Sequence, residues 1–398
     1  MRSVELFAGA GGLAIGMGRA GFDHAAVVEW DHDSCETFRL NQRNHAHDVG
    51  QWPLFEGDAR EFDYGSISDD VMVVSGGPPC QPFSLGGKHR GHMDERDMFP
   101  QAVRAVRELR PNAFIFENVK GLLRQSFASY FEYIYLQLSH PDLTRRRGEA
   151  WEKHRARLER HHISNKGAAS YNVVYRLLNA ANYGVPQRRE RVFLIGFRSD
   201  LGVEWSFPEG THCDDALLRD QWITGEYWER HRVAKRSRPT LSTKLEKRLA
   251  RLRGDHRIME RPWRTVRDAI ADLPDPERHP RNHIPNHLFN PGARTYPGHT
   301  GSPLDEPAKT LKAGDHGVPG GENMLLRPDG SVRYFTVREA ARLQTFPDDY
   351  VFCGSWTETM RQLGNAVPVR LAEVMARSVA DTLNAAARPK VNLVRSDS

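Results

Sequence analysis

The run Val4-Glu5-Leu6-Phe7-Ala8-Gly9-Ala10-Gly11-Gly12-Leu13-Ala14 joins a short apolar strand to the start of a helix through a glycine-rich turn. Glycines there let a ligand approach the backbone at the N-terminus of the helix. Gly9, Gly11 and Ala14 fit the G-x-G-x-x-A pattern, and Glu29 lies where an acidic side chain binds a ribose hydroxyl group. The stretch predicts an adenosine-containing ligand, without deciding between a nicotinamide cofactor and another one.

The strands that follow extend this unit into a sheet. Short apolar segments separated by helix-length stretches occur at residues 25–29, 71–75, 113–117 and 191–196. This alternation is typical of βαβ units and of a parallel sheet covered on both faces. After Trp205 the alternation stops, and Pro, Gly, His and Arg become common. We therefore expect a doubly wound, Rossmann-like α/β domain (residues 1–205 plus 331–398) interrupted by a smaller domain (residues 206–330).

The inserted stretch carries a concentration of positive charge. The whole chain has a formal net charge of +5, but residues 232–267 hold 13 Lys and Arg against 3 Asp and Glu. Such a concentration of positive charge is expected in a protein that binds a nucleic-acid backbone, although a solvent-exposed face of a helix can have the same composition. Within this stretch, four leucines at helical spacing predict one amphipathic helix: Leu241, Leu245, Leu249 and Leu252.

Features that are missing from the sequence argue against several classes of protein. It has no run of about 18 apolar residues and no signal-peptide pattern at its N-terminus, so we expect a cytoplasmic protein without a membrane span. Its four cysteines form no CxxC pair and no zinc-like spacing, so we expect reduced thiols and no metal. Three of them, Cys35, Cys213 and Cys353, read as small buried hydrophobic residues.

The fourth cysteine, Cys80, stands in the run Pro78-Pro79-Cys80-Gln81-Pro82-Phe83-Ser84 directly after a buried strand. A rigid proline loop would present its thiolate, a good nucleophile, at the edge of the sheet beside the proposed cofactor. Glu117 ends the neighbouring strand and could bind an amino-pyrimidine edge if burial raises its pKa. The run Gln187-Arg188-Arg189-Glu190-Arg191 could bind a phosphate or a base carbonyl, or be plain surface charge.

Two residues at other strand ends suit an adenine ring. Trp30 directly follows Glu29 and offers an aromatic face for stacking. Asp58 follows Gly57 at another expected strand end and could accept a hydrogen bond from the adenine amino group. Each is a weak signal alone, but ligands of such sheets bind at the carboxyl ends of the strands, where both are expected.

Over nearly its whole length the sequence resembles the DNA (cytosine-5) methyltransferase family, in particular its bacterial restriction-modification members. The motifs occur in family order, although most members have Leu where this chain has Met98. Those quoted above are joined by Arg96-Asp97-Met98-Phe99, Glu117-Asn118-Val119, Thr336-Val337-Arg338-Glu339-Ala340-Ala341-Arg342-Leu343-Gln344 and Gly364-Asn365-Ala366-Val367-Pro368.

The resemblance implies an S-adenosylmethionine-dependent methyltransferase domain that yields S-adenosylhomocysteine and needs no metal. It implies that Cys80 attacks carbon 6 of a flipped cytosine, that Glu117 contacts its amine and ring nitrogen, and that Arg191 binds its carbonyl, with Arg189 near the nucleophile or a phosphate. The catalytic residues carried over by motif are Cys80, Glu117, Arg189 and Arg191. The cofactor contacts are Phe7, Ala10, Gly11, Gly12, Glu29, Trp30, Asp58, Ala59, Pro79, Met98, Asn365, Ala366 and Val367.

The same resemblance makes residues 206–330 the target-recognition domain, which would read base edges of double-stranded DNA. The expected DNA contacts are Gln81, Ser84 and Thr310, with Thr310 anchoring a phosphate, and Gly314, Gly317, Gly320 and Gly321 fit loops packed against DNA. A monomer acting beside a cognate restriction endonuclease is the expected setting. The role of the helical part, residues 125–171, stays open.

Three alternatives compete with this interpretation. Relatives that methylate tRNA carry Cys-Phe-Thr before the ninth motif, where this chain has Tyr334-Phe335-Thr336, and they have a shorter insert. A nicotinamide-dependent oxidoreductase would explain the glycine turn but not Cys80 and Glu117 together. A catalytically inactive DNA-binding homologue would have lost one of those two side chains.

Overall fold

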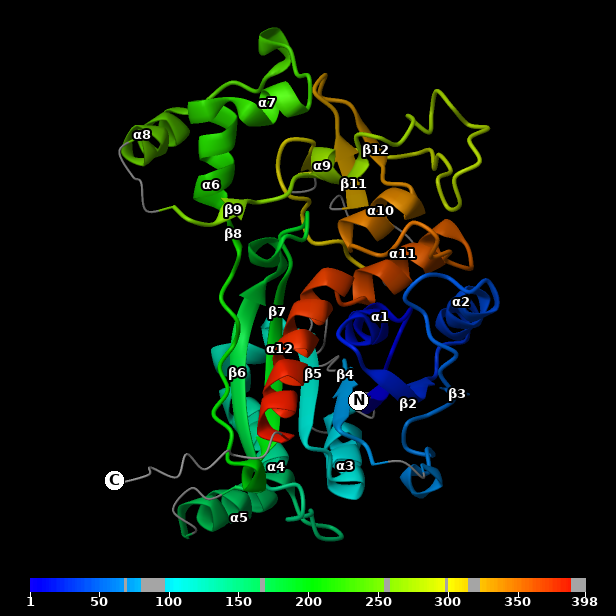
Figure 1. Cartoon of the computed structure of the whole chain (residues 1–398), viewed down its shortest axis with the longest axis vertical. Coiled ribbons are helices and arrows are strands. Elements are labelled where there is room, and N and C mark those ends of the chain that lie inside the picture. The colour runs from blue at the N-terminus through cyan, green and yellow to red at the C-terminus, as the bar shows by residue number, and fades with distance from the viewer. Residues whose placement is uncertain are drawn as a thin grey trace, which may run out of the picture.

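The computed structural model describes residues 1–67, 70–79, 97–164, 169–253, 258–297, 300–313 and 323–387. Its centre is a seven-stranded sheet with the strand order β3-β2-β1-β4-β5-β7-β6 (Figure 1). The strands are β1 (Arg2–Leu6), β2 (Asp23–Glu29), β3 (Leu54–Glu56), β4 (Val73–Gly76), β5 (Ala113–Val119), β6 (Tyr171–Asn179) and β7 (Glu190–Arg198). The predicted doubly wound α/β fold is therefore confirmed.

The expectation of a wholly parallel sheet was wrong at one edge. The first five strands pair in parallel, but β7 runs antiparallel to both β5 and β6. Only residues 180–189 separate β6 from β7. That link is too short for the crossover that a parallel pair requires, so the two strands form a hairpin. Of the seven strands, β6 was not expected from the sequence, whereas β3 ends directly before Gly57, where a strand end was expected.

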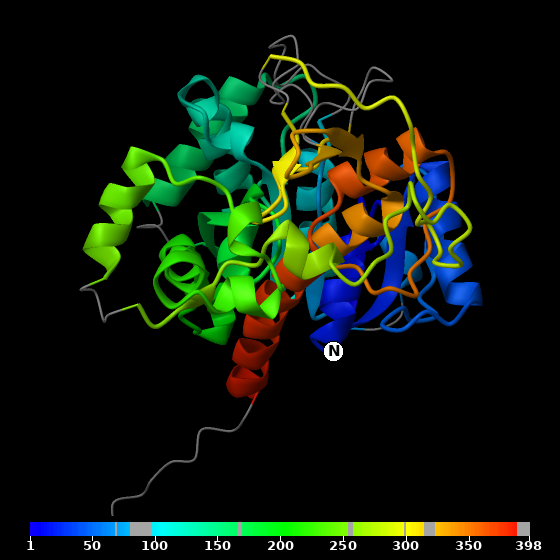
Figure 2. The ribbon, with the colours of Figure 1, turned by 90° about the horizontal axis from the view of Figure 1, so that it is seen from above.

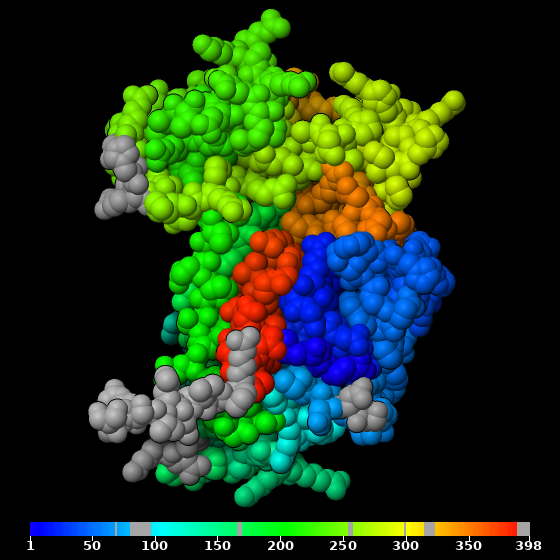
Figure 3. Space-filling model, in the orientation of Figure 1, coloured from blue at the N-terminus to red at the C-terminus, as the bar shows by residue number. Residues whose placement is uncertain are grey.

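Helices cover both faces of the sheet. On one face, α1 (Gly12–Arg19), α2 (His32–Arg43) and α12 (Val369–Ala387) enclose two apolar clusters. On the other face, α3 (Phe99–Leu109), α4 (Ala128–Ser139) and α5 (Trp151–Ser164) pack on the largest cluster. Figure 3 shows α12 beside the N-terminal elements, and Leu371 and Met375 share a cluster with Leu13 and Met17. The last helix thus completes the domain that the first strand begins.

The elements between residues 206 and 334 are short and lie beyond the end of the sheet at which β4 and β5 finish, with α6, α7 and α8 above β6 and β7 (Figures 1 and 2). They comprise two small sheets, β8 (His212–Cys213) with β9 (Arg261–Pro262), and β10 (Ser302–Pro303) with β11 (Met324–Leu326) and β12 (Val332–Tyr334). The helices are α6 (Asp214–Arg219), α7 (Glu226–Arg230), α8 (Thr243–Leu252) and α9 (Val266–Ile270).

The predicted amphipathic helix is confirmed as α8. Leu249 and Leu252 are buried in one apolar cluster, against which Leu241 and Leu245 pack partly buried. The Ser242 hydroxyl caps its N-terminus by accepting from the amide of Leu245. The remaining helices are α10 (Val337–Leu343) and α11 (Trp356–Asn365), and α11 was not predicted.

No helix within the described residues is long and apolar enough to cross a membrane. Of the three cysteines expected to be buried, Cys35 is, whereas Cys213 and Cys353 are half-buried. Cys213 caps the N-terminus of α6, because its sulfur accepts a hydrogen bond from the amide of Ala216. This role was not predicted from the sequence.

Candidate active site

The glycine-rich turn after β1 holds several of the expected cofactor contacts in a fixed backbone conformation. Phe7, Gly9 and Gly11 have φ of 57°, 54° and 83°, in the left-handed region. A Cβ at Gly11 would lie 2.9 Å from the Phe38 ring, and one at Gly12 would lie 2.3 Å from the carbonyl oxygen of Val367, whereas one at Gly9 would meet nothing within 4 Å. Gly11 and Gly12 are therefore required by packing, while Gly9 faces the open space that a ligand needs.

Glu29, at the end of β2, supports this turn with its carboxylate. Its Oε2 accepts from the amide of Gly9 at 2.7 Å, and its Oε1 accepts from the amides of Trp30 and Asp31 at 3.0 and 2.8 Å. Burial raises the pKa of Glu29, while these three bonds act in the opposite direction. A carboxylate has about four acceptor positions, so one is left for a ribose hydroxyl group.

The expected adenine contacts lie at the ends of neighbouring strands. The side chain of Trp30 is 76% exposed, which is unusual for tryptophan and leaves its ring free to stack. The amide of Gly57 donates to the Glu29 carbonyl at 2.9 Å, which puts Asp58 and the buried Ala59 beside the same edge. Asp58 pairs with Arg60 at 3.1 Å and stays partly exposed. This edge fits an adenosine group.

Two further expected contacts meet at the end of β4. The amide of Met98 donates to the carbonyl of Pro79 at 3.2 Å. These two residues are therefore neighbours in the structure, although they are 19 positions apart in the sequence. At the end of α11, Asn365 is exposed, whereas the following Ala366 and Val367 are buried. All thirteen expected cofactor residues lie within the described residues: at or after the ends of β1 to β4, just before α3, or at the end of α11 and directly after it.

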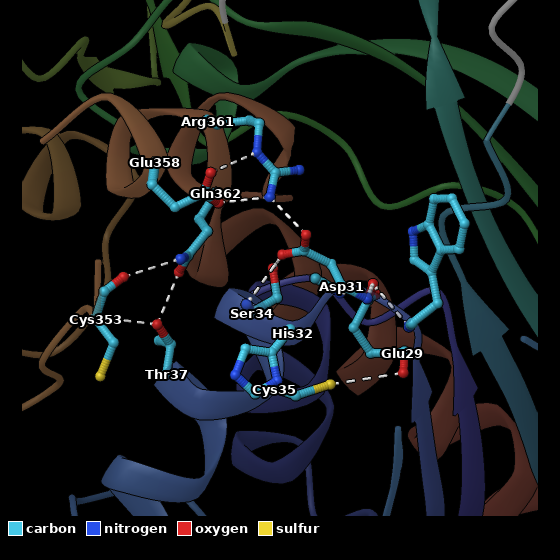
Figure 4. Close-up of polar contacts among 12 residues, drawn as sticks. Glu29, Asp31, His32, Ser34, Cys35, Thr37, Cys353, Glu358, Arg361 and Gln362 are labelled. Atoms are coloured by element: carbon cyan, nitrogen blue, oxygen red, sulfur yellow. Dashed lines mark hydrogen bonds and ion pairs between the residues drawn. The ribbon is translucent and has the colours of Figure 1, made fainter. Parts of the chain in front are cut away.

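The first and last parts of the chain are joined at this edge by a polar network (Figure 4). Arg361 of α11 contacts Asp31 of the turn before α2, with 2.6 Å between Nη2 and Oδ1. Asp31 also caps α2 by accepting from the amide of Ser34 at 3.0 Å. Thr37 donates to the side chain of Gln362 at 2.9 Å. These contacts hold α11 against α2, next to Glu29 and Trp30.

Glu117 and Arg191 form a buried pair at the ends of β5 and β7. The Arg191 Nε atom lies 2.8 Å from Glu117 Oε1, and the two side chains are only 12% and 9% exposed. The pair is an ion contact without good hydrogen-bond alignment, because Oε1 has no hydrogen-bond partner among the described residues. Burial raises the pKa of Glu117, as expected, and Arg191 and then Arg189 oppose that rise. A buried carboxyl oxygen that is paired by charge without a well-aligned hydrogen bond keeps capacity to accept from a polar ligand such as a base edge.

The carboxyl group of Glu117 lies beside the end of β4. A Cβ placed on Gly77 would be 3.6 Å from its Oε2. The neighbouring Asn118 donates from its side chain to the Pro78 carbonyl at 2.9 Å, which fixes the proline pair that precedes Cys80. Cys80, Gln81 and Ser84 lie outside the described residues, as do Gly314, Gly317, Gly320 and Gly321.

Two expected site residues are engaged by the backbone of the protein itself. Arg189 has no exposed surface, and its guanidinium group donates to three backbone carbonyls. The Thr310 hydroxyl donates to the carbonyl of Arg188 at 2.7 Å, so its proton is already engaged. Burial explains the case of Arg189, since a desolvated donor must find an acceptor inside the protein, whereas Thr310 is partly exposed.

The sheet, the glycine turn and the acidic end of β2 together suit an enzyme that binds an adenosine-containing cofactor, such as an S-adenosylmethionine-dependent methyltransferase. Solved structures share the fold: a DNA modification methyltransferase encoded within an Escherichia coli prophage (20% identity, TM-score 0.57, covering 96% of this chain and 99% of that one) and the Dnmt2 methyltransferase of S. pombe (16% identity, TM-score 0.54, covering 98% and 100%). The family model of the C-5 cytosine-specific DNA methylases matches residues 1–142 and 152–381. The chain belongs to that family, as its motifs predicted.

Relatives that match nearly the whole chain carry more specific names. The chain is 31% identical over 391 residues to the type II methyltransferase M.NgoMIV of Neisseria gonorrhoeae, covering 96% of this chain and 97% of that protein. It is 30% identical over 384 residues to M.Eco47II of Escherichia coli, covering 96% and 79%. The protein is a DNA cytosine-5 methyltransferase that uses S-adenosylmethionine, and the alternative of a nicotinamide-dependent oxidoreductase is excluded.

Some residues that hold the site together were missed in the sequence. Arg361, Asp31 and Asn118 were not among the expected site residues, although the last stands inside a recognised motif. Glu5, in β1, was missed as well: it is fully buried and accepts from the Ser75 hydroxyl at 3.0 Å. A polar residue inside an otherwise apolar strand was the available signal for Glu5, since a buried carboxyl group needs a partner.

Proposed function

We propose that this enzyme methylates a cytosine within one short sequence of double-stranded DNA, using Cys80 as its covalent nucleophile. Carbon 6 of a cytosine is out of reach inside the base stack, so the base must be rotated out of the helix. The observation that carries the proposal is the buried pair of Glu117 and Arg191 next to Gly77, three residues before Cys80. A pyrimidine held there would meet both a carboxyl group and a guanidinium group.

Each side chain has a defined task in this proposal. The Cys80 thiolate forms a bond to carbon 6, and the ring electrons move toward carbon 5 and the ring nitrogen. Glu117, whose pKa is raised by burial, donates a proton to that nitrogen and accepts from the exocyclic amine. Arg191 donates to the base carbonyl and stabilises the negative charge there. S-adenosylmethionine supplies, when bound, a methyl group on a positively charged sulfur.

The reaction ends by elimination. Once carbon 5 carries the methyl group, a base removes the proton from carbon 5, and the electrons of that bond form the double bond between carbons 5 and 6. The bond to the Cys80 sulfur breaks, and the ring nitrogen returns its proton to Glu117. The thiolate is then free for another turnover. Glu29, Trp30 and Asp58 would hold the adenosine part of the cofactor, with Glu29 accepting from a ribose hydroxyl group. Phe7, Ala10, Pro79, Met98 and Asn365 would line the rest of its site.

Residues 206–330 are proposed as the part that reads the DNA sequence. Their position beyond the end of the sheet at which β5 finishes supports this assignment, because Glu117 lies near that end (Figure 1). Exposed cations of α8 support it further, since positive charge is the general requirement for binding a phosphate backbone. Residues 1–205 and 331–398 would form the catalytic domain.

We also infer the biological role of the enzyme and the partner with which it acts. Its relatives are named type II methyltransferases, a class that works beside restriction endonucleases. A monomer that protects the DNA of its own cell from an endonuclease cutting the same sequence fits this relationship. The enzyme would act in the cytoplasm, where that DNA lies.

Bisulfite sequencing of a plasmid from cells that express the protein tests the proposal. We expect one short sequence to retain its cytosine, and Cys80→Ser to abolish that signal while leaving cofactor binding in place. A duplex with 5-fluorocytosine at the target should become covalently attached to the wild-type protein. Absence of an adduct at a verified target would remove Cys80 as the nucleophile, and modification of tRNA instead of the plasmid would favour the tRNA alternative.

A further inference from the structure

Arg189 is a cation without any exposed surface. Its Nη1 donates to the carbonyl of Leu311 at 3.1 Å, and its Nη2 donates to the carbonyls of Gly364 and Ala366 at 2.7 and 2.9 Å. Burial lowers the pKa of its guanidinium group, and Arg191 acts in the same direction while Glu117 opposes them. Three carbonyl oxygens from two distant segments converge on this side chain, which therefore ties the segments together.

Each of the two segments has its own part in the proposed function. Leu311 follows Thr310 in the proposed DNA-reading domain, and Gly364 and Ala366 flank Asn365, an expected cofactor contact. Their backbones also touch directly. A Cβ at Gly364 would lie 2.2 Å from the amide nitrogen of Ala313, so no side chain fits between the segments. The glycine is required by this close approach.

The DNA-side segment is fixed on its other side as well. The amide of Leu311 donates to the side chain of Gln187 at 3.1 Å, and the amide of Arg188 donates to the carbonyl of Ala308 at 2.8 Å. The buried side chain of Asn323 accepts from the amide of Lys312 and donates to its carbonyl, at 3.0 and 2.9 Å. Residues 308–313 thus have one defined position.

The cofactor-side segment continues these contacts to the glycine turn. A Cβ at Gly12 would lie 2.3 Å from the carbonyl oxygen of Val367. The Tyr350 hydroxyl donates to the carbonyl of Ala10 at 2.6 Å. An unbroken series of contacts therefore runs from the cofactor turn, through residues 364–367, to residues 311–313.

We propose that Arg189 is a positioning residue that couples cofactor binding to DNA binding, and that it does not contact the substrate. A ligand at the glycine turn stabilises the position of residues 364–367, and through Arg189 that of residues 311–313. DNA that binds the second segment stabilises the first by the same contacts, because such coupling is reciprocal. This inference rests on the proposed role of residues 206–330 in reading DNA.

The experiment measures the affinity of a fluorescent duplex, carrying the target sequence found by bisulfite sequencing, with and without saturating S-adenosylhomocysteine. We expect the wild-type protein to bind the duplex at least about fivefold more tightly with the cofactor product. Arg189→Met should bring this ratio close to one. Arg189→Lys, which keeps a cation and part of the hydrogen bonding, should give an intermediate ratio.

Arg338 offers a matched control. It too has no exposed surface and donates to three carbonyls, those of Pro285, Pro347 and Tyr350, at 3.1, 3.1 and 2.7 Å. Arg338→Met leaves a similar cavity and three carbonyls without their donor. One of them belongs to Tyr350, which contacts Ala10 of the glycine turn, but the variant does not separate residues 311–313 from residues 364–366. Its ratio should remain that of the wild type, even where its melting temperature falls.

A wild-type ratio of one, or an unchanged ratio in Arg189→Met, would overturn the inference. Equal loss of the ratio in Arg338→Met would do so too, because it would assign the effect to general destabilisation. Should Arg189→Met fail to fold, as judged by thermal unfolding, Arg189→Lys decides in its place. Absence of methylation by the wild type would instead remove the proposed function, since both binding measurements are independent of turnover.

Discussion

Arg361 Nη2 lies 2.6 Å from Asp31 Oδ1, so an ion pair joins two residues that are 330 positions apart. Through this contact α11, which ends at Asn365, is held against the turn that carries Glu29 and Trp30 (Figure 4). The side chains of Arg361 and Asp31 are 33% and 22% exposed. For a pair this accessible to water, a contribution of up to about 1 kcal/mol is expected.

Asp31→Asn should therefore weaken the binding of S-adenosylhomocysteine by up to about fivefold, because asparagine keeps the cap of α2 but loses the ion pair. Isothermal titration at low and high salt measures this. Glu358→Gln is the control, since Glu358 contacts Arg361 within the same helix and does not join the two segments. Equal affinities of Asp31→Asn and the wild type at low salt would show that the pair does not shape the cofactor site.

Glu117 should give the enzyme a pH dependence. Its pKa is raised by burial, so the protonated form that donates to the base persists above the usual range of a carboxyl group and is lost as the pH rises through the raised value. We expect kcat to fall on that alkaline limb. Glu117→Gln should lower kcat by about 100-fold or more and lack the limb, because the amide does not titrate. Single-turnover rates across pH measure both effects; a persisting limb would assign it to another group.

Glu5 should make the stability of the protein depend on pH. Burial raises its pKa to about 8, while the bonds from Ser75 and Ala14 oppose the rise. Because the folded state binds this proton more tightly than the unfolded state, the stabilisation is complete below about pH 4.5 and is lost as the pH rises toward 8. Glu5→Gln should flatten the fall of the melting temperature between pH 5 and 9. The exposed Glu61, changed to Gln, is the matched control.

The cations on α8 should contact the DNA backbone. Lys244, Lys247 and Arg251 are exposed, whereas Arg248 is engaged with Asp214 at 2.7 Å. Replacing the three exposed cations by glutamine should raise the KM for DNA and lower the slope of log KM against log salt by about 0.9 for each phosphate that these side chains neutralise. The methylated sequence should stay the same, because interactions with the DNA backbone carry no base information.

The control for this variant removes equal charge elsewhere. Arg147, Lys153 and Arg160 are exposed on or near α5, at the opposite end of the molecule from α8 (Figure 1). Their replacement by glutamine should leave the salt slope unchanged. If both triple variants change the slope equally, long-range charge and not direct binding explains the effect.

Local patterns explain which parts of the fold and site could be predicted. The strand before Phe7, the glycine turn and Glu29 lie within about 25 residues of one another, and their spacing alone indicates the fold. The amphipathic α8 was predictable for the same reason, since its leucines repeat at helical spacing. Burial of Glu117 also followed from its place at the end of an apolar strand.

Other features depend on chain segments that meet only after folding. Nothing near Arg361 in the sequence points to Asp31, and nothing in the run around Arg189 shows that its acceptors are Leu311, Gly364 and Ala366. The reversed direction of β7 was hidden because an apolar strand has the same pattern in either direction. The direction of β7 relative to β6 follows from the short link between the two strands, residues 180–189.

The ligand edge of the sheet is built from both ends of the chain: Glu29 and Trp30 come early, whereas Tyr350, Arg361 and Asn365 come late. During translation, a nascent chain therefore displays the glycine turn long before the residues that complete its surroundings leave the ribosome. If residues 364–367 complete the cofactor site as proposed, the polypeptide gains its full affinity for the methyl donor only when synthesis has passed residue 367. Unfinished chains, released early, would then be unable to compete with finished ones for the donor.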